Sequence, residues 1–305
     1  MSDDEYSSNC LFNPSMAVQR YIFTRNAIQR YNKDNNKDNN EKNPPISTVL
    51  DLGCNECHLV RFLKQLSSLK VIHCLDLQTH HLQFGQRNVR PSAMDYLKER
   101  QHQLTVHLYT GSALQPDGRF GGDGGGDHQV DAVTAIELVE HLWPQTELPA
   151  FVSTVFGHIR PKLVVITTPN AEYNSLIQRA VAEAKKKDAD AEDGKEPGDN
   201  SKNNNNSSSN GFRDADHKFE WTREQFASWC TGVVQQYDDY RFHLDGVGRL
   251  AADTEQVTGY CTQIALFTRK VAQDRPSAGK TSQTKAGEVY KLFSSHCYRK
   301  STPSS

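Results

Sequence analysis

Two glutamates and a histidine lie close together just after a predicted strand. Residues 130–136 (VDAVTAI) read as a buried strand, and Glu137, Glu140 and His141 follow it. If a helical turn begins there, this spacing brings all three side chains to one side. Two carboxylates and an imidazole form a hard, mostly oxygen ligand set that suits Mg²⁺ or Mn²⁺, whereas Zn²⁺ more usually takes cysteines or several histidines. The pattern therefore predicts a divalent metal site, and the alternative is a solvated helix face.

A fourth candidate ligand stands far along the chain. His217 lies within residues 212–221 (FRDADHKFEW), well beyond His141. Only the fold can bring these two imidazoles together. The position of residues 137–141 at a strand end favours a shared site, because ligands of parallel sheets bind beyond the carboxyl ends of the strands.

A second strand end has the residues of a nucleotide-binding turn. Residues 46–52 read as a strand that runs into Asp51, Gly53 and Asn55, and Asp76 ends the next strand. A glycine permits close backbone approach, and the later acid is placed to accept ribose hydroxyls. The lack of a G-x-G-x-x-G set disfavours a dinucleotide, and the pattern resembles the S-adenosylmethionine site of class I methyltransferases. The alternatives are a tight turn at Gly53 and a strand-end cap at Asp76.

The same turn contains a C-x-x-C-H pattern, at residues 54–58. This pattern also occurs at c-type haem attachment sites, redox pairs and zinc sites. We disfavour all three interpretations because the motif lies inside the expected cofactor turn, no secretory signal begins the chain, and no second C-x-x-C is present. The other cysteines are expected to be small core or surface residues: Cys10, Cys74, Cys230, Cys261 and Cys297.

Strands that alternate with helices must position these residues. The segments 46–52, 71–77, 104–109, 130–136 and 163–168 read as strands with helical segments between them, which indicates a parallel sheet covered on both faces. A final pair of strands, at 240–247 and 260–267, suggests an antiparallel edge. We therefore expect an α/β fold of the class I Rossmann-like methyltransferase type, with a seven-stranded, mostly parallel sheet and an antiparallel edge strand.

Composition divides the 305 residues into a core domain and polar additions. Residues 1–31 are expected to pack on the active site, and residues 46–270 to form the methyltransferase domain. Polar tracts without core-forming residues are expected to be inserts, and the C-terminal segment a flexible tail: 32–45, 121–128, 184–210 and 271–305. No stretch is apolar over the roughly 20 residues that a membrane helix needs. The net charge of −2 argues against a broad electrostatic grip on nucleic acid, but not against binding one end of it.

Several motifs together resemble the small-RNA 3′-terminal 2′-O-methyltransferases. They are ELVEH at 137–141, TPN at 168–170, the 212–221 run and GYCTQ at 259–263, with FNP at 12–14 followed by QRY at 19–21. The resemblance covers residues 12–267 apart from the inserts. The last two motifs resemble the N-terminal segment of the animal, piRNA-type members.

The resemblance implies roles for individual residues. It implies that the metal ligands, which are also the catalytic residues, are Glu137, Glu140, His141 and His217, with His141 as a candidate proton acceptor. It implies that S-adenosylmethionine is held by Asp51, Gly53, Asn55, Cys57, Asp76 and Ser112, although the family more often has glycine where Asn55 stands. Candidates for holding the RNA end are Arg20, Arg25, Thr168, Pro169 and Asn170.

The function so implied is metal-dependent 2′-O-methylation of the 3′-terminal ribose of single-stranded small RNAs (piRNA or siRNA), which protects the 3′ end. A vicinal diol on a divalent metal would explain why only a ribose end is accepted. The resemblance also implies a monomer that receives RNA from a Piwi or Argonaute protein and binds neither DNA nor membranes. The expected location is the cytoplasm, with RNA granules as one possible site. The alternatives are a metal-independent methyltransferase of a small molecule or protein, and a non-catalytic binding module on the same fold.

Overall fold

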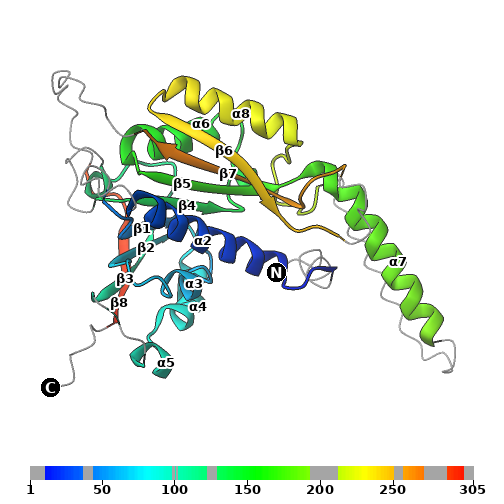
Figure 1. Ribbon diagram of the computed structural model, residues 1–305, viewed down its shortest axis with the longest axis horizontal. Helices are drawn as coiled ribbons and strands as arrows, with labels where there is room; N and C mark the ends of the chain where they lie inside the picture. Colours follow the sequence, from blue (N-terminus) through cyan, green and yellow to red (C-terminus); the bar gives the residue numbers. More distant parts are fainter. Residues whose placement is uncertain are drawn as a thin grey trace.

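A single mixed sheet forms the centre of the molecule. The computed structural model describes residues 11–36, 44–97, 100, 102–121, 129–192, 212–250, 257–270 and 287–298. The eight strands of the sheet lie in the order β6-β7-β5-β4-β1-β2-β3-β8 (Figure 1). Their bounds are β1 Thr48–Leu52, β2 Val71–Asp76, β3 Leu104–Thr110, β4 Ala132–Ile136, β5 Leu163–Pro169, β6 Tyr240–Val247, β7 Thr262–Arg269 and β8 Lys291–Tyr298.

The five strands β1 to β5 are parallel. Nearly all residues of β1, β2, β4 and β5 are buried, so these four read as apolar runs, whereas β3 alternates over most of its length. Strands β6, β7 and β8 pair antiparallel at the two ends of the sheet. The predicted α/β fold with a mostly parallel sheet is thus confirmed. Because β1 to β5 run in one direction, their carboxyl ends meet at one edge, where a ligand site is expected.

Helices cover both faces of the sheet (Figure 1). One apolar core lies between the sheet and the group of α6 (Glu147–Val152), η3 (Ser153–Ile159) and α8 (Arg223–Gln236). The other lies between the sheet and α2 (Met16–Asn36), α3 (Val60–Leu63) and α4 (Thr79–Val89). The remaining helical segments are α5 (Ala93–Tyr96), η1 (Gly118–Phe120), η2 (Val139–His141), η4 (Ala171–Tyr173) and α7 (Asn174–Glu192).

The C-terminal segment departs from the sequence prediction. The sheet was expected to have seven strands, but β8 adds an eighth strand beside β3. This strand lies within the expected flexible tail, 271–305, of which residues 271–286 and 299–305 lie outside the described part of the chain. Tyr290 and Tyr298 at its two ends are buried, and the carboxylate of Asp117 accepts the backbone N–H groups of Val289 and Tyr290 at 2.7 Å each. These tertiary contacts hold the segment KLFSSHCY in a strand.

Two of the expected inserts begin inside helices. Helix α2 continues to Asn36, and the side chain of Asn32 is buried and bonds the backbone of Ile46 in both directions. Helix α7 continues to Glu192 and runs away from the sheet (Figure 1). The other parts of these inserts (37–43 and 193–210), most of the insert at 121–128 and residues 1–10 lie outside the described residues. Within the described part of the chain, no helix has the length and apolar character that spanning a membrane requires.

Candidate active site

The backbone turns sharply where β4 ends. Glu137 has a φ of +50°, in the left-handed region that costs a non-glycine residue about 1 kcal/mol or more. Its N–H is held by the carbonyl and the hydroxyl of Thr167 on the neighbouring strand β5, at 3.2 and 3.0 Å. The turn leads into η2, which contains Glu140 and His141. The predicted ligand segment therefore begins at the carboxyl edge of the sheet, as the sequence indicated.

Three of the four predicted metal ligands come together there. One ligand atom from each of Glu140, His141 and His217 lies within 4.8 Å of the other two. The imidazole rings meet edge to face with centroids 4.9 Å apart, and the N–H of Lys218 donates to the carbonyl of Glu140 at 2.8 Å. The backbone bond docks residues 212–221 onto η2, which is how the fold brings His217 to the cluster.

The electrostatics of this cluster fit a cation. Glu140 is fully buried, and neither of its carboxylate oxygens has a hydrogen-bond partner in the described structure. Burial, followed by the charge of Glu137, raises the pKa of Glu140 well above its usual range. Burial and the nearby His217 lower the pKa of His141. A buried carboxylate is expensive without a compensating partner, so a carboxylate that faces two imidazoles is suited to hold a divalent metal ion.

A buried carboxylate orients His217. Oε1 of Glu220 lies 2.7 Å from Nδ1 of His217, and the Glu220 side chain is fully buried. The same carboxylate accepts the side-chain amide of Asn174 at 2.6 Å and the backbone N–H of Arg213 at 2.7 Å. With Nδ1 engaged, Nε2 is the nitrogen left to face the cluster. Carboxylates that orient ligand histidines in this way are usual in metal sites.

The fourth predicted ligand, Glu137, takes different partners. Its Oε2 lies 3.1 Å from Nη1 of Arg20, and its Oε1 accepts the hydroxyl of Thr167 at 2.9 Å. Arg20 comes from α2, so the N-terminal helix reaches the site across the sheet edge. The carboxylate of Glu137 thus lies beside the cluster of Glu140, His141 and His217 rather than within it.

The predicted cofactor turn has an unusual backbone. Gly53, Asn55 and Cys57 all have positive φ, at +69°, +47° and +57°. A Cβ at Gly53 would lie 2.7 Å from Leu138, which directly precedes η2, so only glycine fits. The N–H of Asn55 donates to Oδ2 of Asp76 at 2.8 Å. The turn after β1 and the metal-ligand turn after β4 are therefore packed against each other.

The remaining predicted cofactor residues line the ends of β1 to β3. Asp51 is buried and accepts the hydroxyl of Thr134 at 2.6 Å, and burial raises its pKa to about 7. Asp76 ends β2, with Oδ1 3.2 Å from Nδ1 of His81. Ser112 follows β3 and is half-buried. All three stand at the carboxyl edge of the parallel strands, which is where a nucleotide-type ligand binds in such folds.

The predicted RNA-binding residues are dispersed. Arg20 lies at the cluster, whereas the guanidinium of Arg25 bonds Asn26 and Gln65 instead. Thr168 and Pro169 are buried at the end of β5. Beyond them, Asn170 uses its side chain on the protein's own backbone, with its amide donating to the carbonyls of Thr258 and Tyr260 at 2.9 Å each.

Sequence reasoning missed three residues of the site. Glu220 and Thr167 were not singled out, although the first lies within the 212–221 run and the second precedes the TPN motif. Trp143, two positions beyond His141, is 54% exposed and has Nζ of Lys218 5.3 Å from its ring centroid. The sequence signal for Trp143 was a tryptophan directly after the predicted ligand turn. Its exposure in the structure sets it apart, because large aromatic side chains are usually buried.

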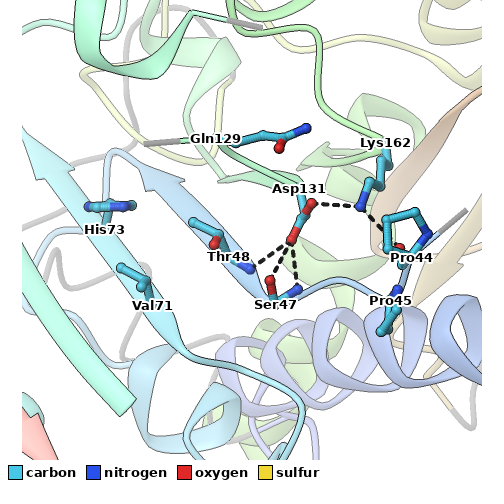
Figure 2. Close-up of a pocket in the computed structure, with 9 residues that line it drawn as sticks. All are labelled: Pro44, Pro45, Ser47, Thr48, Val71, His73, Gln129, Asp131 and Lys162. Atoms are coloured by element: carbon cyan, nitrogen blue, oxygen red, sulfur yellow. Dashed lines mark hydrogen bonds and ion pairs between the residues drawn. The ribbon is translucent and has the colours of Figure 1, made fainter. Parts of the chain in front are cut away.

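A pocket of about 360 Å³ lies at the opposite edge of the sheet (Figure 2). It is formed near the amino ends of the strands, around Asp131, whose carboxylate accepts from Ser47 and Thr48 and pairs with Lys162 at 2.7 Å. These bonds join the start of β1 to the segment before β5. Because the pocket is at the amino edge, it is separate from the predicted site.

Comparison with known proteins identifies relatives of the chain. No protein-family model matches the chain. The curated small RNA 2′-O-methyltransferase of Xenopus tropicalis is 32% identical over 92% of this chain and 61% of its own length. The corresponding figures are 33%, 92% and 57% for Mus musculus, and 30%, 92% and 62% for Drosophila melanogaster. The chain is therefore similar to the small RNA 2′-O-methyltransferases over about nine tenths of its own length. It spans about six tenths of the length of these relatives.

Solved structures agree with this family and with the class I fold. The crystal structure of small RNA methyltransferase HEN1 superposes with a TM-score of 0.64 at 26% identity, over 95% of this chain and 29% of that chain. The bacterial methyltransferase domain CtHen1-CN gives 0.54 at 25% identity, over 83% and 100%. A plantazolicin methyltransferase solved with SAH shares the fold alone, with a TM-score of 0.52 at 9% identity over 88% of this chain and 91% of that chain. The predicted family resemblance and fold class are confirmed.

Proposed function

We propose that the chain transfers a methyl group from S-adenosylmethionine to the 2′ hydroxyl of the 3′-terminal ribose of a small RNA. Similarity to relatives named small RNA 2′-O-methyltransferase supports the methyltransferase activity and the RNA substrate. The observation that carries the metal dependence is the buried, unpaired carboxylate of Glu140 in reach of two imidazoles.

Glu140, His141 and His217 would hold Mg²⁺ or Mn²⁺, with Glu137 beside them. A bound dication supplies polarisation of a ribose hydroxyl and so lowers its pKa. Glu220 fixes the orientation of His217 through the 2.7 Å bond to Nδ1. Burial and the nearby His217 lower the pKa of His141, which favours the neutral imidazole that a metal ion requires of a histidine ligand.

The cofactor is assigned to the turn after β1. Gly53 permits a backbone approach that a side chain would block, and the bond from Asn55 to Asp76 fixes the width of the turn. The carboxylate of Asp76 stands at the end of β2, where it can also accept ribose hydroxyls of S-adenosylmethionine. Because Leu138 packs on Gly53, the two turns are held in fixed relation, and the methyl group would be presented towards the cluster.

The test combines three RNA ends with metal removal. A single-stranded RNA with a 3′-terminal diol is incubated with labelled S-adenosylmethionine and Mn²⁺ or Mg²⁺, with and without EDTA. Matched RNAs carry a 3′ phosphate or a terminal deoxyribose. We expect label only on the diol end, loss of activity in EDTA, and resistance of the product to periodate. Activity that survives EDTA, or label on all three ends, would contradict the proposal.

A matched pair of variants locates the metal. Glu140→Gln removes the buried charge, whereas Glu224→Gln removes an exposed charge in the first turn of α8. We expect Glu140→Gln to lose activity and Glu224→Gln to keep it. Delivery of RNA by a Piwi or Argonaute protein, a monomeric state and a cytoplasmic location remain predictions.

A further inference from the structure

Three cysteine thiols meet behind the cofactor turn. Cys54 and Cys57 lie on the turn and Cys74 lies on β2, and their sulfur atoms are all within 4.8 Å of one another. The sulfurs of Cys54 and Cys57 are 3.6 Å apart, and all three residues are buried. The sequence motif showed only the first two. Cys74, expected to be a scattered core residue, joins them because β1 and β2 are parallel neighbours in which Asp51 faces Cys74.

Ordinary core packing does not account for the electrostatics of this cluster. Hydrogen bonds from Cys54 and Cys74 lower the pKa of Cys57 to about 5, although burial opposes this. The carboxylates of Asp76 and Asp51 add negative charge nearby, the first acting on Cys57 and the second on Cys74. Burial raises the pKa of Cys54. Three buried sulfur atoms this close together, with carboxylates nearby, form an environment that favours a cation.

We propose that Cys54, Cys57 and Cys74 bind one soft, thiophilic metal ion, such as Cu⁺ or Cd²⁺, as thiolates. Binding releases the remaining thiol protons to solvent and replaces the shared hydrogen bonds by metal–sulfur bonds. Three sulfurs favour soft ions over Mg²⁺ and Mn²⁺, which prefer oxygen ligands. The chain thus has two metal sites of opposite preference on either side of the cofactor turn: a soft site of three sulfurs and the hard site at Glu140.

The competing chemistry at this cluster is a disulfide between Cys54 and Cys57. Its formation would shorten the sulfur–sulfur distance from 3.6 Å to about 2.05 Å, and it needs an oxidant such as a peroxide or a second disulfide. The third thiol distinguishes the two cases. A disulfide leaves Cys74 out, whereas a metal ion uses all three sulfurs.

The test is a Cd²⁺ titration of the whole chain, reduced and kept under nitrogen with excess Mg²⁺. Thiolate–cadmium bonds absorb in the ultraviolet, and we expect this band to saturate at one Cd²⁺ per chain. Cys54→Ser and Cys74→Ser should lose the saturable band. Cys230→Ser, which removes a single buried thiol of α8, and His217→Ala at the hard site should both keep it.

A second measurement uses the unmodified chain, in case the serine variants do not fold. In a ¹¹³Cd NMR spectrum, sulfur ligands produce a strongly deshielded resonance, whereas oxygen and nitrogen ligands produce a shielded one. We expect one deshielded signal at one equivalent of Cd²⁺. A shielded signal alone, a band that survives in Cys74→Ser, or an intact mass that shows a disulfide in the reduced sample would each overturn the proposal.

Discussion

Nη1 of Arg20 lies 3.1 Å from Oε2 of Glu137, and this ion pair joins the N-terminal helix to the strand-end turn of the candidate site. Both side chains are largely buried, at 12% and 20% exposure. Burial and the charge of Glu137 raise the pKa of Glu140, whereas the guanidinium of Arg20 acts in the opposite direction. In the described structure, Arg20 therefore compensates a concentration of negative charge that a metal ion would also compensate.

Replacing Arg20 by alanine should destabilise the metal-free chain. Breaking a buried pair leaves one uncompensated charge, which costs about 3 kcal/mol. We expect the free energy of unfolding to fall by about that amount in EDTA, and by less in saturating Mn²⁺, since the dication takes over the compensation. Urea denaturation with and without Mn²⁺ measures both values.

Arg25 is the control on the same helix. Its guanidinium bonds Asn26 and Gln65 at the surface, so Arg25→Ala should change the unfolding free energy by under about 0.5 kcal/mol in either buffer. If Arg20→Ala lost the same amount of stability with and without Mn²⁺, Arg20 would be a purely structural residue.

Glu220→Gln should weaken metal binding while leaving the cofactor site intact. The amide keeps the shape of the carboxylate but lacks its charge, so it cannot fix the ring of His217 in the same way. Loss of such an orienting carboxylate typically lowers metal affinity by about 10- to 100-fold. Calorimetric titration with Mn²⁺ should show this drop, and titration with S-adenosylmethionine should show no comparable change.

Glu172→Gln is the matched change at the surface. Glu172 also pairs with a basic side chain, Arg223 at 2.7 Å, but both are partly exposed. Exposed pairs contribute about 1 kcal/mol at most, so Mn²⁺ affinity should be unchanged. Equal losses of Mn²⁺ and cofactor affinity in Glu220→Gln would indicate that Glu220 supports folding rather than the metal cluster.

The parallel core of the fold could be predicted from the sequence because its strands are short apolar runs with no competing interpretation. Strand β8 could not be predicted in this way, because its residues form a strand only through contacts with Asp117 and β3. The helical segment expected between the strands at 46–52 and 71–77 is only the short α3 (Val60–Leu63), because positive φ at Asn55 and Cys57 delays its start. Local propensity does not contain either effect.

The candidate site could be predicted only in part, because local sequence patterns report some of its residues and not others. Glu140 and His141 are neighbours in sequence at a strand end, so position alone pointed to them. His217 was reached through the family resemblance, and its approach depends on the backbone bond from Lys218 to Glu140. The separate partners of Glu137 and the approach of Cys74 to the C-x-x-C motif arise from strand pairing, which no local pattern reports.

Trp143→Ala should weaken RNA binding more than turnover. The indole of Trp143 is 54% exposed and has the Lys218 amine 5.3 Å from its ring centroid, so it would offer a stacking surface for a base with a cation nearby for a phosphate. Stacking on an aromatic side chain contributes about 1–3 kcal/mol per base, or roughly five- to 150-fold in KM. We expect that rise in KM with little change in kcat, and near-normal KM in Trp143→Phe.

Met94→Ala is the control for Trp143, since Met94 is an equally exposed apolar residue, on α5. Its KM should stay at the value of the unmodified chain. A fall in kcat without a rise in KM in Trp143→Ala would show that Trp143 shapes the ligand turn instead of contacting RNA.

Asp117→Asn should loosen β8 from the sheet. Burial would raise the pKa of Asp117, but bonds from Arg119 and from the backbone of Tyr290 and Val289 outweigh it and lower the pKa to about 2. Because the folded pKa lies below the ordinary value of 3.8, this carboxylate stabilises the fold above pH 4, by about 2 kcal/mol, and loses that contribution as the pH falls towards 2. We expect Asp117→Asn to lose about 2 kcal/mol at pH 7 and to show a flatter dependence of unfolding free energy on pH between 4 and 2.

Glu288→Gln is the control, because its side chain is 72% exposed. It should match the unmodified chain in urea denaturation across this range. Hydrogen exchange should show earlier opening of residues 291–298 in Asp117→Asn alone. Unchanged exchange in β8 would mean that the buried Tyr290 and Tyr298 hold the strand without Asp117.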